Sequence, residues 1–103
     1  MPYMEMCGST MIKSFRNQVT EDLFRRKAPK GIQADVAKRA FNKMFMINAA
    51  TRVEDLRVPP GNRLELLAGD RAGQWSVRVN NQWRICFEWK GVDAFNVEFV
   101  DYH

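Results

Sequence analysis

The chain has a single histidine, His103, and only two cysteines, Cys7 and Cys86, among its 103 residues. The cysteines are far apart and lack the short spacing of a metal-ligand motif, so we expect free thiols in a reducing cytoplasm rather than a metal site or a bridge. No apolar run approaches the ~20 residues that cross a membrane. No segment has the charged start and apolar centre of a signal peptide. These absences favour a cytoplasmic protein that needs neither a metal nor another cofactor.

The length and composition indicate one folded domain. Hydrophobic residues make up 46% of the chain and aromatic residues 12%, which is typical of a globule and not of a disordered tail. The first ten residues, MPYMEMCGST, show no periodicity and end in Gly-Ser-Thr. We therefore expect residues 1–10 to be a flexible N-terminal extension and residues 11–103 to form the domain.

The positive charge is concentrated in one half of the chain. Residues 11–44 contain nine Lys or Arg against three Asp or Glu, whereas residues 52–103 contain seven against eight. Solvated helix faces often have this composition. A one-sided basic surface on a small protein also suits a nucleic-acid backbone.

Residues 69–89, GDRAGQWSVRVNNQWRICFEW, have the pattern of two strands joined by a turn. Apolar side chains occupy every second position over residues 75–79 and again over residues 83–87. This period of two predicts a half-buried antiparallel hairpin. The asparagines between the two runs tolerate the backbone of a tight turn.

The apolar pattern also selects the register of the hairpin. A three-residue loop, 80–82, pairs Val77 with Ile85, whereas a two-residue loop would bring Arg84 onto the apolar face. The favoured register sets Arg78 opposite Arg84, and like charges directly across a ladder are destabilising. Either the two solvated arginines splay apart, or an anion such as phosphate lies between them.

Two helices are expected before the hairpin. Thr20 is a suitable N-cap for a short helix over residues 20–26, which the Ala-Pro-Lys-Gly sequence then ends. An apolar stripe at three-to-four spacing predicts a longer helix over residues 34–48. Thr51 is expected to cap a short turn that follows it.

Three further strands complete the expected elements: a short one over residues 12–15, one over residues 62–67 in which Leu64 and Leu66 alternate with Arg63 and Glu65, and one over residues 95–99. Helices segregated on one face of a mostly antiparallel sheet define an α+β architecture. The two N-terminal helices should cover the apolar face of the hairpin. The opposite, polar face should carry the side chains of Arg63, Arg78 and Arg84.

The residues left for chemistry are several arginines, one terminal histidine, a tyrosine and some carboxylates. Arginine can neutralise a phosphate during a reaction, and His with Asp can move protons. Such a set would suffice for RNA cleavage by the neighbouring 2′-OH, which needs no metal and no enzyme nucleophile. A lone terminal histidine is by itself more often without function, so composition does not establish this chemistry.

Three segments resemble the HigB branch of the RelE/ParE toxin superfamily: MIKSF from Met11, LRVPPGNRLELLAGDRAGQWSVRVNNQWRICFEW from Leu56, and VEFVDYH from Val97. The likeness covers nearly everything from Met11 to His103. It is most specific in the GDRxGxWSxRVNxxWRIxF block and in the final Asp-Tyr-His.

The resemblance implies a RelE-like fold and the toxin of a type II toxin–antitoxin system, with mRNA cleavage on the ribosome. It also implies a HigA-type antitoxin that contains a helix-turn-helix. The arginine of the family's Trp-Arg-Ile strand falls on Arg84, and Arg78 occupies a position that is arginine in many relatives. The catalytic residues implied in this way are Arg78, Arg84, Asp101, Tyr102 and His103.

Two departures from the family pattern bear on activity. This chain has Glu65 where some members carry His, and Ala68 where some carry Lys. The loss of a proton carrier and of a phosphate-facing cation implies slower or altered cleavage. We expect a mild toxin, and a target other than the coding message remains open.

Further cations are predicted to bind RNA, and rival functions remain open. We expect Lys38, Arg39 and Lys43 to contact the ribosomal RNA backbone, with Arg63 and Arg71 as further RNA contacts, and the antitoxin to bind away from Arg84. The first rival is a ParE-like toxin that poisons gyrase without cleaving RNA. The second is a small ribosome- or RNA-binding protein in which His103 is incidental.

Overall fold

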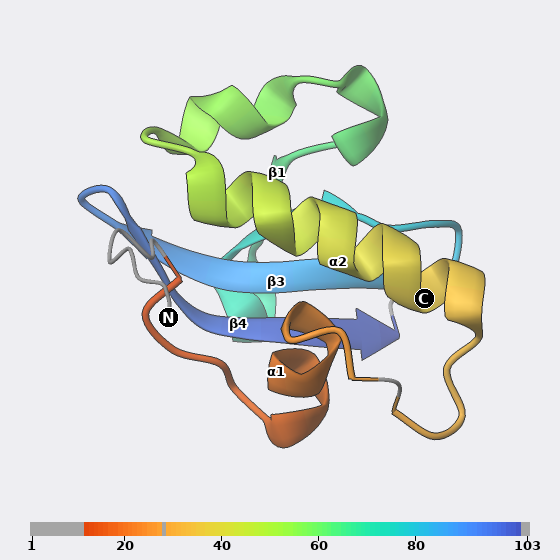
Figure 1. The fold of residues 1–103 in the computed structure, drawn as a ribbon. Coiled ribbons are helices and arrows are strands. Elements are labelled where there is room, and N and C mark those ends of the chain that lie inside the picture. Colours follow the sequence, from red (N-terminus) through yellow and green to blue (C-terminus); the bar gives the residue numbers. More distant parts are fainter. Residues whose placement is uncertain (1–11, 28, 102–103) are drawn as a thin grey trace.

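Residues 12–27 and 29–101 are described in the computed structural model, so the expectations for residues 1–10, Tyr102 and His103 fall outside the described residues. The described part contains a four-stranded antiparallel sheet in the order β1-β2-β3-β4. Its helices and strands follow the chain as shown in Figure 1. They are α1 (Gln18–Phe24), α2 (Ala34–Ala49), β1 (Glu65–Leu66), β2 (Trp75–Arg78), β3 (Trp83–Lys90) and β4 (Asp93–Asp101), with the short 3-10 helices η2 (Val53–Arg57), η3 (Pro60–Asn62) and η4 (Gly69–Arg71) between α2 and β2.

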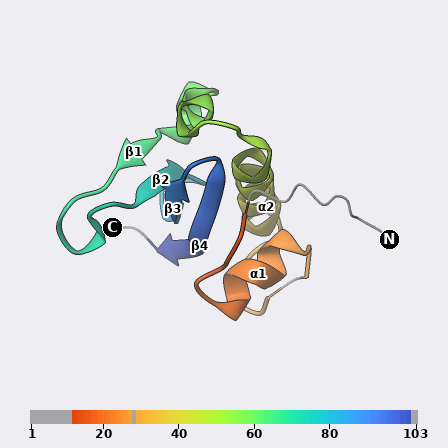
Figure 2. The same cartoon turned by 90° about the vertical axis from the view of Figure 1, so that its left-hand side faces the viewer.

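Both α-helices lie on one side of the sheet, and the segment that contains β1 lies toward the other side (Figure 2). The core between the helices and the sheet is apolar and closed. Met44 and Ile47 of α2 and Ile85 and Phe87 of β3 are fully buried in it. The predicted α+β architecture, with two helices packed on one face of an antiparallel sheet, is therefore confirmed.

The hairpin has the predicted register. Val77 lies opposite Ile85, and Arg78 lies opposite Arg84. Asn80 closes the turn, because its side-chain oxygen accepts hydrogen bonds from the backbone N–H groups of Gln82 and Trp83, both at 2.8 Å. The apolar pattern alone thus selected the correct loop length.

Helix α1 begins earlier than predicted, and Thr20 is not its cap. Asn17 is the N-cap, and its Oδ1 accepts from the Thr20 N–H at 3.0 Å and from the Thr20 hydroxyl at 2.7 Å. Thr20 is fully buried, and its Oγ1 accepts a hydrogen bond from the backbone N–H of Phe99 in β4 at 2.9 Å. A hydroxyl that fits a cap by sequence is used here to attach the helix to the sheet.

Thr51 is likewise not a cap. The carboxylate of Asp55, inside η2, reaches back and accepts from the backbone N–H groups of Thr51 and Arg52, both at 3.1 Å. These backbone hydrogen bonds lower the pKa of Asp55 below its usual value. The carboxylate of Asp55, a residue inside η2, thus caps the start of this 3-10 helix.

The expected strand over residues 62–67 is shorter than predicted, and Leu66 is exposed to solvent. Only Glu65 and Leu66 form β1, and Leu66 is 58% exposed. Asn62 ends a 3-10 helix instead, because its buried side-chain amide donates to the carbonyls of Leu56 at 3.1 Å and Val58 at 3.4 Å. These contacts between side chain and backbone are more favourable here than the strand that the alternation predicts.

Residues 12–15 do not form a full strand either. Isolated parallel bridges join Ile12 to Ala94 and Phe15 to Val97. Backbone hydrogen bonds between this segment and β4 include Lys13 N–H to the Ala94 carbonyl at 2.7 Å. The segment therefore covers the outer edge of β4 without a regular ladder.

The second face of the sheet is less open than predicted. Ser76 and Cys86 are fully buried there and Arg84 is only 9% exposed. The segment that includes β1 and η4 folds over this face, and Arg71 of η4 reaches Glu98 of β4 at 3.1 Å. Burial raises the pKa of the Cys86 thiol, which is therefore protonated at neutral pH.

Candidate functional site

Arg84 is the most firmly placed of the predicted catalytic residues. Its Nε donates to the Ser76 hydroxyl at 2.9 Å, and its Nη2 donates to the Arg63 carbonyl at 2.7 Å. The side chain is 11% exposed, so most of the guanidinium is surrounded by protein and only a small part of it faces solvent. Hydrogen bonds of this kind hold an arginine in one orientation before a substrate arrives.

The Arg63 carbonyl points at Arg84 because of the local backbone. Arg63 follows η3 in the left-handed region, with φ 45° and ψ 54°. This conformation is uncommon for a residue with a side chain. The strain is located at the residue that positions Arg84, which is typical of functional sites.

Arg78 and Arg84 face each other in register, but their side chains bind different groups. Arg78 Nη2 donates to the Asn81 side-chain oxygen, whereas Arg84 binds Ser76 and the Arg63 carbonyl. The two arginines thus splay toward separate partners, as in the first alternative drawn from the sequence. Arg78 remains partly exposed.

Lys43 of α2 lies close enough to Arg39 and Arg78 for their charges to act on it, and we call these three residues the cationic cluster. Lys43 is half-buried and donates to Asn62 Oδ1 at 2.6 Å. Burial, and then the positive charges of Arg39 and Arg78, lower the pKa of Lys43 below its usual value. The charge effect requires proximity, so the fold brings together cations that are far apart in the sequence.

A short path connects the cationic cluster to Arg84. Lys43 binds the side chain of Asn62, and the next residue, Arg63, gives its carbonyl to Arg84. Arg78 lies opposite Arg84 on the neighbouring strand. We therefore treat Arg39, Lys43, Arg78 and Arg84, together with the backbone of Arg63, as one candidate site; the side chain of Arg63 is exposed.

Glu65 is the carboxylate at this site. Its Oε1 lies 3.7 Å from Arg84 Nη2, and its side chain is 55% exposed. Pairing of Glu65 with Ser76 in the β1–β2 ladder fixes this position. The residue that replaces a family histidine is thus beside the buried arginine, on its solvent side.

Asp101 is placed less favourably for direct contact with a phosphate on Arg84. Its Cα lies opposite that of Trp83, and the alternation of a strand puts their side chains on the other face from Arg84. Its Oδ2 accepts from the Gln82 side chain at 3.1 Å. Tyr102 and His103 lie outside the described residues, so their catalytic assignments remain predictions.

The other two predicted RNA contacts, Arg71 and Lys38, lie away from this site. Arg71 Nη1 binds both Glu98 and Gln74, each at 3.1 Å, so a carboxylate of the same chain already balances its charge. Lys38 is exposed but lines a pocket with Leu23 of α1 and Phe41 of α2. The neighbouring residues Lys38 and Arg39 therefore lie on different surfaces: Lys38 lines the pocket, and Arg39 belongs to the cationic cluster.

Sequence reasoning missed the two residues that position the cations. Ser76 lies on the same face as Arg84 in the predicted register, so its proximity could have been read from the alternation. Asn62 could not, because its contact with Lys43 joins residues 19 positions apart through η3.

The described residues show two further absences. Among residues 12–27 and 29–101, no group of three His, Cys, Asp or Glu side chains could hold a metal ion. In the same part of the chain, no helix has the length and apolar character that a membrane span requires. The charged groups that the site does offer are mainly cations, with the Glu65 carboxylate beside Arg84.

A small α+β fold with a buried, oriented arginine and a cluster of lysine and arginine defines a class of protein suited to binding a polyanion. The chain matches the family described as the RelE-like toxin of the type II toxin–antitoxin system HigB over residues 13–103. The chain belongs to this family, and its class therefore implies an antitoxin partner.

Individual relatives agree with the family match. The chain is 35% identical over 94 residues to Toxin HigB-1 of Vibrio cholerae, covering 90% of this chain and 98% of the relative. It is 34% identical over 93 residues to Endoribonuclease HigB of Proteus vulgaris, covering 90% and 100%. An uncharacterized protein of Haemophilus influenzae is 35% identical over 72 residues, or 70% of each chain.

Proposed function

We propose that this protein is a toxin that cleaves mRNA on the ribosome, acts in the cytoplasm and is controlled by a HigA-type antitoxin. The observation that supports this proposal best is Arg84, a guanidinium fixed by Ser76 and the Arg63 carbonyl beside the cationic cluster. The similarity of the chain to a relative named endoribonuclease indicates the class of reaction. The family match supports the role as a toxin.

In this proposal the cations divide the work of binding and chemistry. Arg39, Lys43 and Arg63 hold the RNA backbone, and Arg84 with help from Arg78 contacts the scissile phosphate. Arginine does not lose its proton in proteins, so Arg84 acts by electrostatic stabilisation of the charge that builds on the phosphate oxygens. Its pre-set hydrogen bonds mean that little reorganisation is needed when that charge develops.

The reaction we propose is attack of the 2′-OH on the adjacent phosphate. The new O–P bond forms as the bond to the 5′-oxygen breaks, which leaves a cyclic phosphate and a 5′-OH. His103, with a reference pKa of about 6.5, serves as the general acid or base. Asp101 orients His103 rather than touching the phosphate, and Tyr102 stacks on a base or orients the phosphate.

The test is a comparison of the full chain with a chain that ends at Asp101. Brief expression, followed by mapping of RNA 5′ ends, should show messages cut inside codons only with the full chain. Purified protein with ribosomes and a defined mRNA should give 5′-OH ends. Full toxicity of the shortened chain would rule out the assignment of Tyr102 and His103. A DNA-damage response without cut messages would instead indicate the gyrase-poisoning rival.

A further inference from the structure

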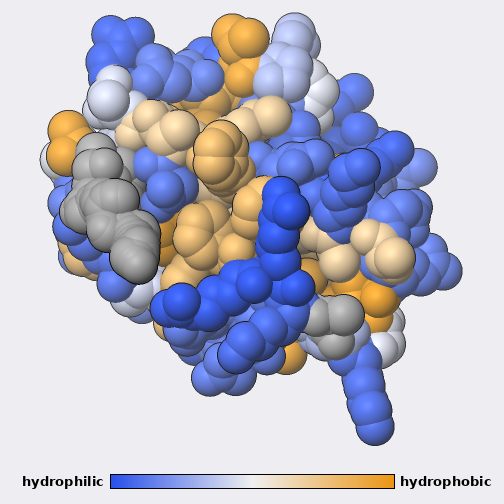
Figure 3. Space-filling model, in the orientation of Figure 1, coloured by the Kyte–Doolittle hydropathy of each residue, from blue (hydrophilic) through white to orange (hydrophobic). Residues whose placement is uncertain are grey.

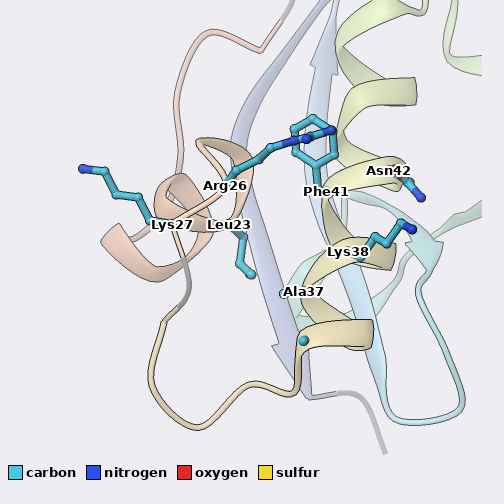
Figure 4. Close-up of a pocket in the computed structure, with 8 residues that line it drawn as sticks. Leu23, Arg26, Lys27, Ala37, Lys38, Phe41 and Asn42 are labelled. Atoms are coloured by element: carbon cyan, nitrogen blue, oxygen red, sulfur yellow. The ribbon is translucent and has the colours of Figure 1, made fainter.

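A pocket of about 300 Å³ lies between α1 and α2, on the helix side of the sheet (Figure 4). Its apolar lining includes Leu23, Ala37 and Phe41, and its basic lining includes Arg26, Lys27 and Lys38. Arg84 belongs to the other side of the sheet, where it binds Ser76 and the Arg63 carbonyl. The pocket is therefore on the other side of the sheet from Arg84, and its lining does not include Arg39 or Lys43.

Aromatic rings extend the apolar surface beyond the pocket. The ring of Phe41 packs against those of Phe24 and Phe45, with centroid distances of 6.0 Å and 6.1 Å. Phe45 is 58% exposed. The space-filling view in the orientation of Figure 1 shows apolar surface near the centre of this face, bordered by hydrophilic residues (Figure 3). An apolar patch with a polar border is typical of an interaction site.

The conformation of Arg26 limits what the pocket can bind. The Arg26 guanidinium carbon lies 4.2 Å from the centre of the Phe41 ring, and Figure 4 shows the side chain passing over this ring. Arg26 has φ 61°, a left-handed conformation that is uncommon for arginine. A nucleic-acid base that stacked on Phe41 would have to displace this cation. The pocket is therefore better suited to aliphatic side chains than to bases.

The basic residues of the pocket are available to carboxylates. Arg25, the C-cap of α1, forms an ion pair with Glu21 at 2.9 Å. Within the part of the chain that the structure describes, none of the ion pairs includes Arg26, Lys27 or Lys38. Lys27 and Lys38 are exposed. An apolar pocket bordered by such cations is complementary to an acidic segment with apolar side chains.

We propose that the pocket between α1 and α2 docks the protein antitoxin through a segment in which apolar side chains are flanked by Asp or Glu. This inference rests on the proposed function, because it takes the occupant to be the antitoxin of a toxin. The apolar side chains fill the space beside Leu23 and Ala37, and the carboxylates pair with Arg26, Lys27 and Lys38. The antitoxin then binds on the side of the sheet away from Arg84.

Binding of the cognate antitoxin to the full toxin chain tests the proposal. The variant Lys27→Glu/Lys38→Glu reverses two of the positive charges at the rim of the pocket, and we call it the rim variant. The variant Ala37→Met fills the pocket without adding a polar group. The control, Arg57→Glu/Lys90→Glu, reverses two exposed charges on η2 and the end of β3. Circular dichroism and thermal melting check that all variants fold.

The rim variant should lower the association rate about tenfold at low salt and flatten its salt dependence, because exposed charges act mainly on the encounter. Ala37→Met should raise the dissociation rate about tenfold or more, since it removes the space that an apolar anchor fills. The control should stay within about twofold of the wild type. Antitoxin binding that is unchanged in both folded pocket variants would overturn the proposal.

Two further measurements identify the occupant and separate this proposal from the proposed function. The affinity for a fluorescent single-stranded RNA should fall no more in the rim variant than in the control, because both variants change the net charge of the protein by the same amount. A loss of RNA binding confined to the pocket variants, with antitoxin binding retained, would show that the pocket binds RNA. Cleavage that persists in Arg84→Ala would refute the proposed mechanism but leave the docking result unaffected.

Discussion

The two faces of α2 use basic residues in different ways. Arg39 and Lys43 lie with Arg78 in the cationic cluster, where Lys43 is half-buried and bound to Asn62. Lys38, one position before Arg39, is exposed beside the apolar lining of the pocket. Because residues four apart share a helix face and adjacent residues do not, one basic stretch supplies two surfaces. A count of charges along α2 would have treated them as one.

The difference between the faces lies in what accompanies the cations. The cationic cluster lies beside hydrogen-bonding groups, Asn62 and the Arg63 carbonyl, that lead to Arg84. The pocket surrounds its cations with Leu23, Ala37 and Phe41. The first environment suits a phosphate, and the second suits an apolar side chain next to a carboxylate. The following substitutions test this separation.

The largest expected effect is that of Arg84→Ala on RNA cleavage. Loss of one preorganised donor should lower the cleavage rate by about a hundredfold to a thousandfold. The same change leaves Ser76 and the Arg63 carbonyl without this donor, which costs about 1–3 kcal/mol of folding stability. Single-turnover cleavage at a temperature well below the melting transition separates the two effects. Antitoxin binding should be retained, and its loss in a folded variant would contradict the separation of the surfaces.

The next effect is that of Arg39→Gln/Lys43→Gln on RNA binding. Each lost phosphate contact should lower the slope of log affinity against log salt by about 0.7 for a single strand, so the pair should lower it by about 1.4. Affinity at 0.1 M salt should fall about tenfold or more. Titration of ribosomes or single-stranded RNA at several salt concentrations measures the slope. The matched variant Lys27→Gln/Lys38→Gln, at the edge of the pocket between α1 and α2, should change it far less.

A smaller effect, of opposite sign, is expected for Glu65→Gln. The Glu65 carboxylate lies 3.7 Å from Arg84 Nη2, where it competes with an incoming phosphate. An exposed pair of this kind contributes about 0.2–1 kcal/mol, so cleavage should become up to about fivefold faster. Measurement of kcat and KM separately locates the gain in substrate binding. A large fall in kcat would instead make Glu65 a proton carrier.

The smallest effect concerns pH. Burial, together with the positive charges of Arg39 and Arg78, lowers the pKa of Lys43 in the folded protein below its ordinary value of 10.5. Between the lowered value and 10.5 the unfolded chain binds more protons, so folding stability should rise with pH in this window. Lys43→Met should remove part of that rise, as urea unfolding at a series of alkaline pH values would show. RNA binding should fall over the same window, because Lys43 loses its charge there.

The sequence predicted the features that depend on periodicity. The hairpin register followed from alternation, and α2 ends one residue beyond its expected limit. The arginines of the hairpin were placed correctly opposite each other for the same reason. These features depend on local patterns that the fold does not override.

The predictions that were wrong concern features that depend on contacts between residues far apart in the sequence. Thr20 has the chemistry of a cap, but its hydroxyl binds Phe99, which is 79 positions away. The strand before the hairpin shortens because Asn62 binds the carbonyls of Leu56 and Val58. The polar face is partly covered by the segment that carries Arg71, which bonds with Glu98 of β4. None of these pairings has a periodic signal in the sequence.

The shortness of β1 bears on solubility. It pairs with only Trp75 and Ser76, so Val77 and Arg78 of β2 have no β1 partner, whereas residues 12–16 hydrogen-bond along the edge of β4. An uncovered strand edge can recruit a strand from another molecule, and charged side chains are a common defence against such edge-to-edge association. Arg78 ends β2 at this edge, and Lys43 of α2 lies close enough for the charge of Arg78 to act on it. The same two cations would therefore keep the sheet monomeric, and their joint neutralisation would favour self-association.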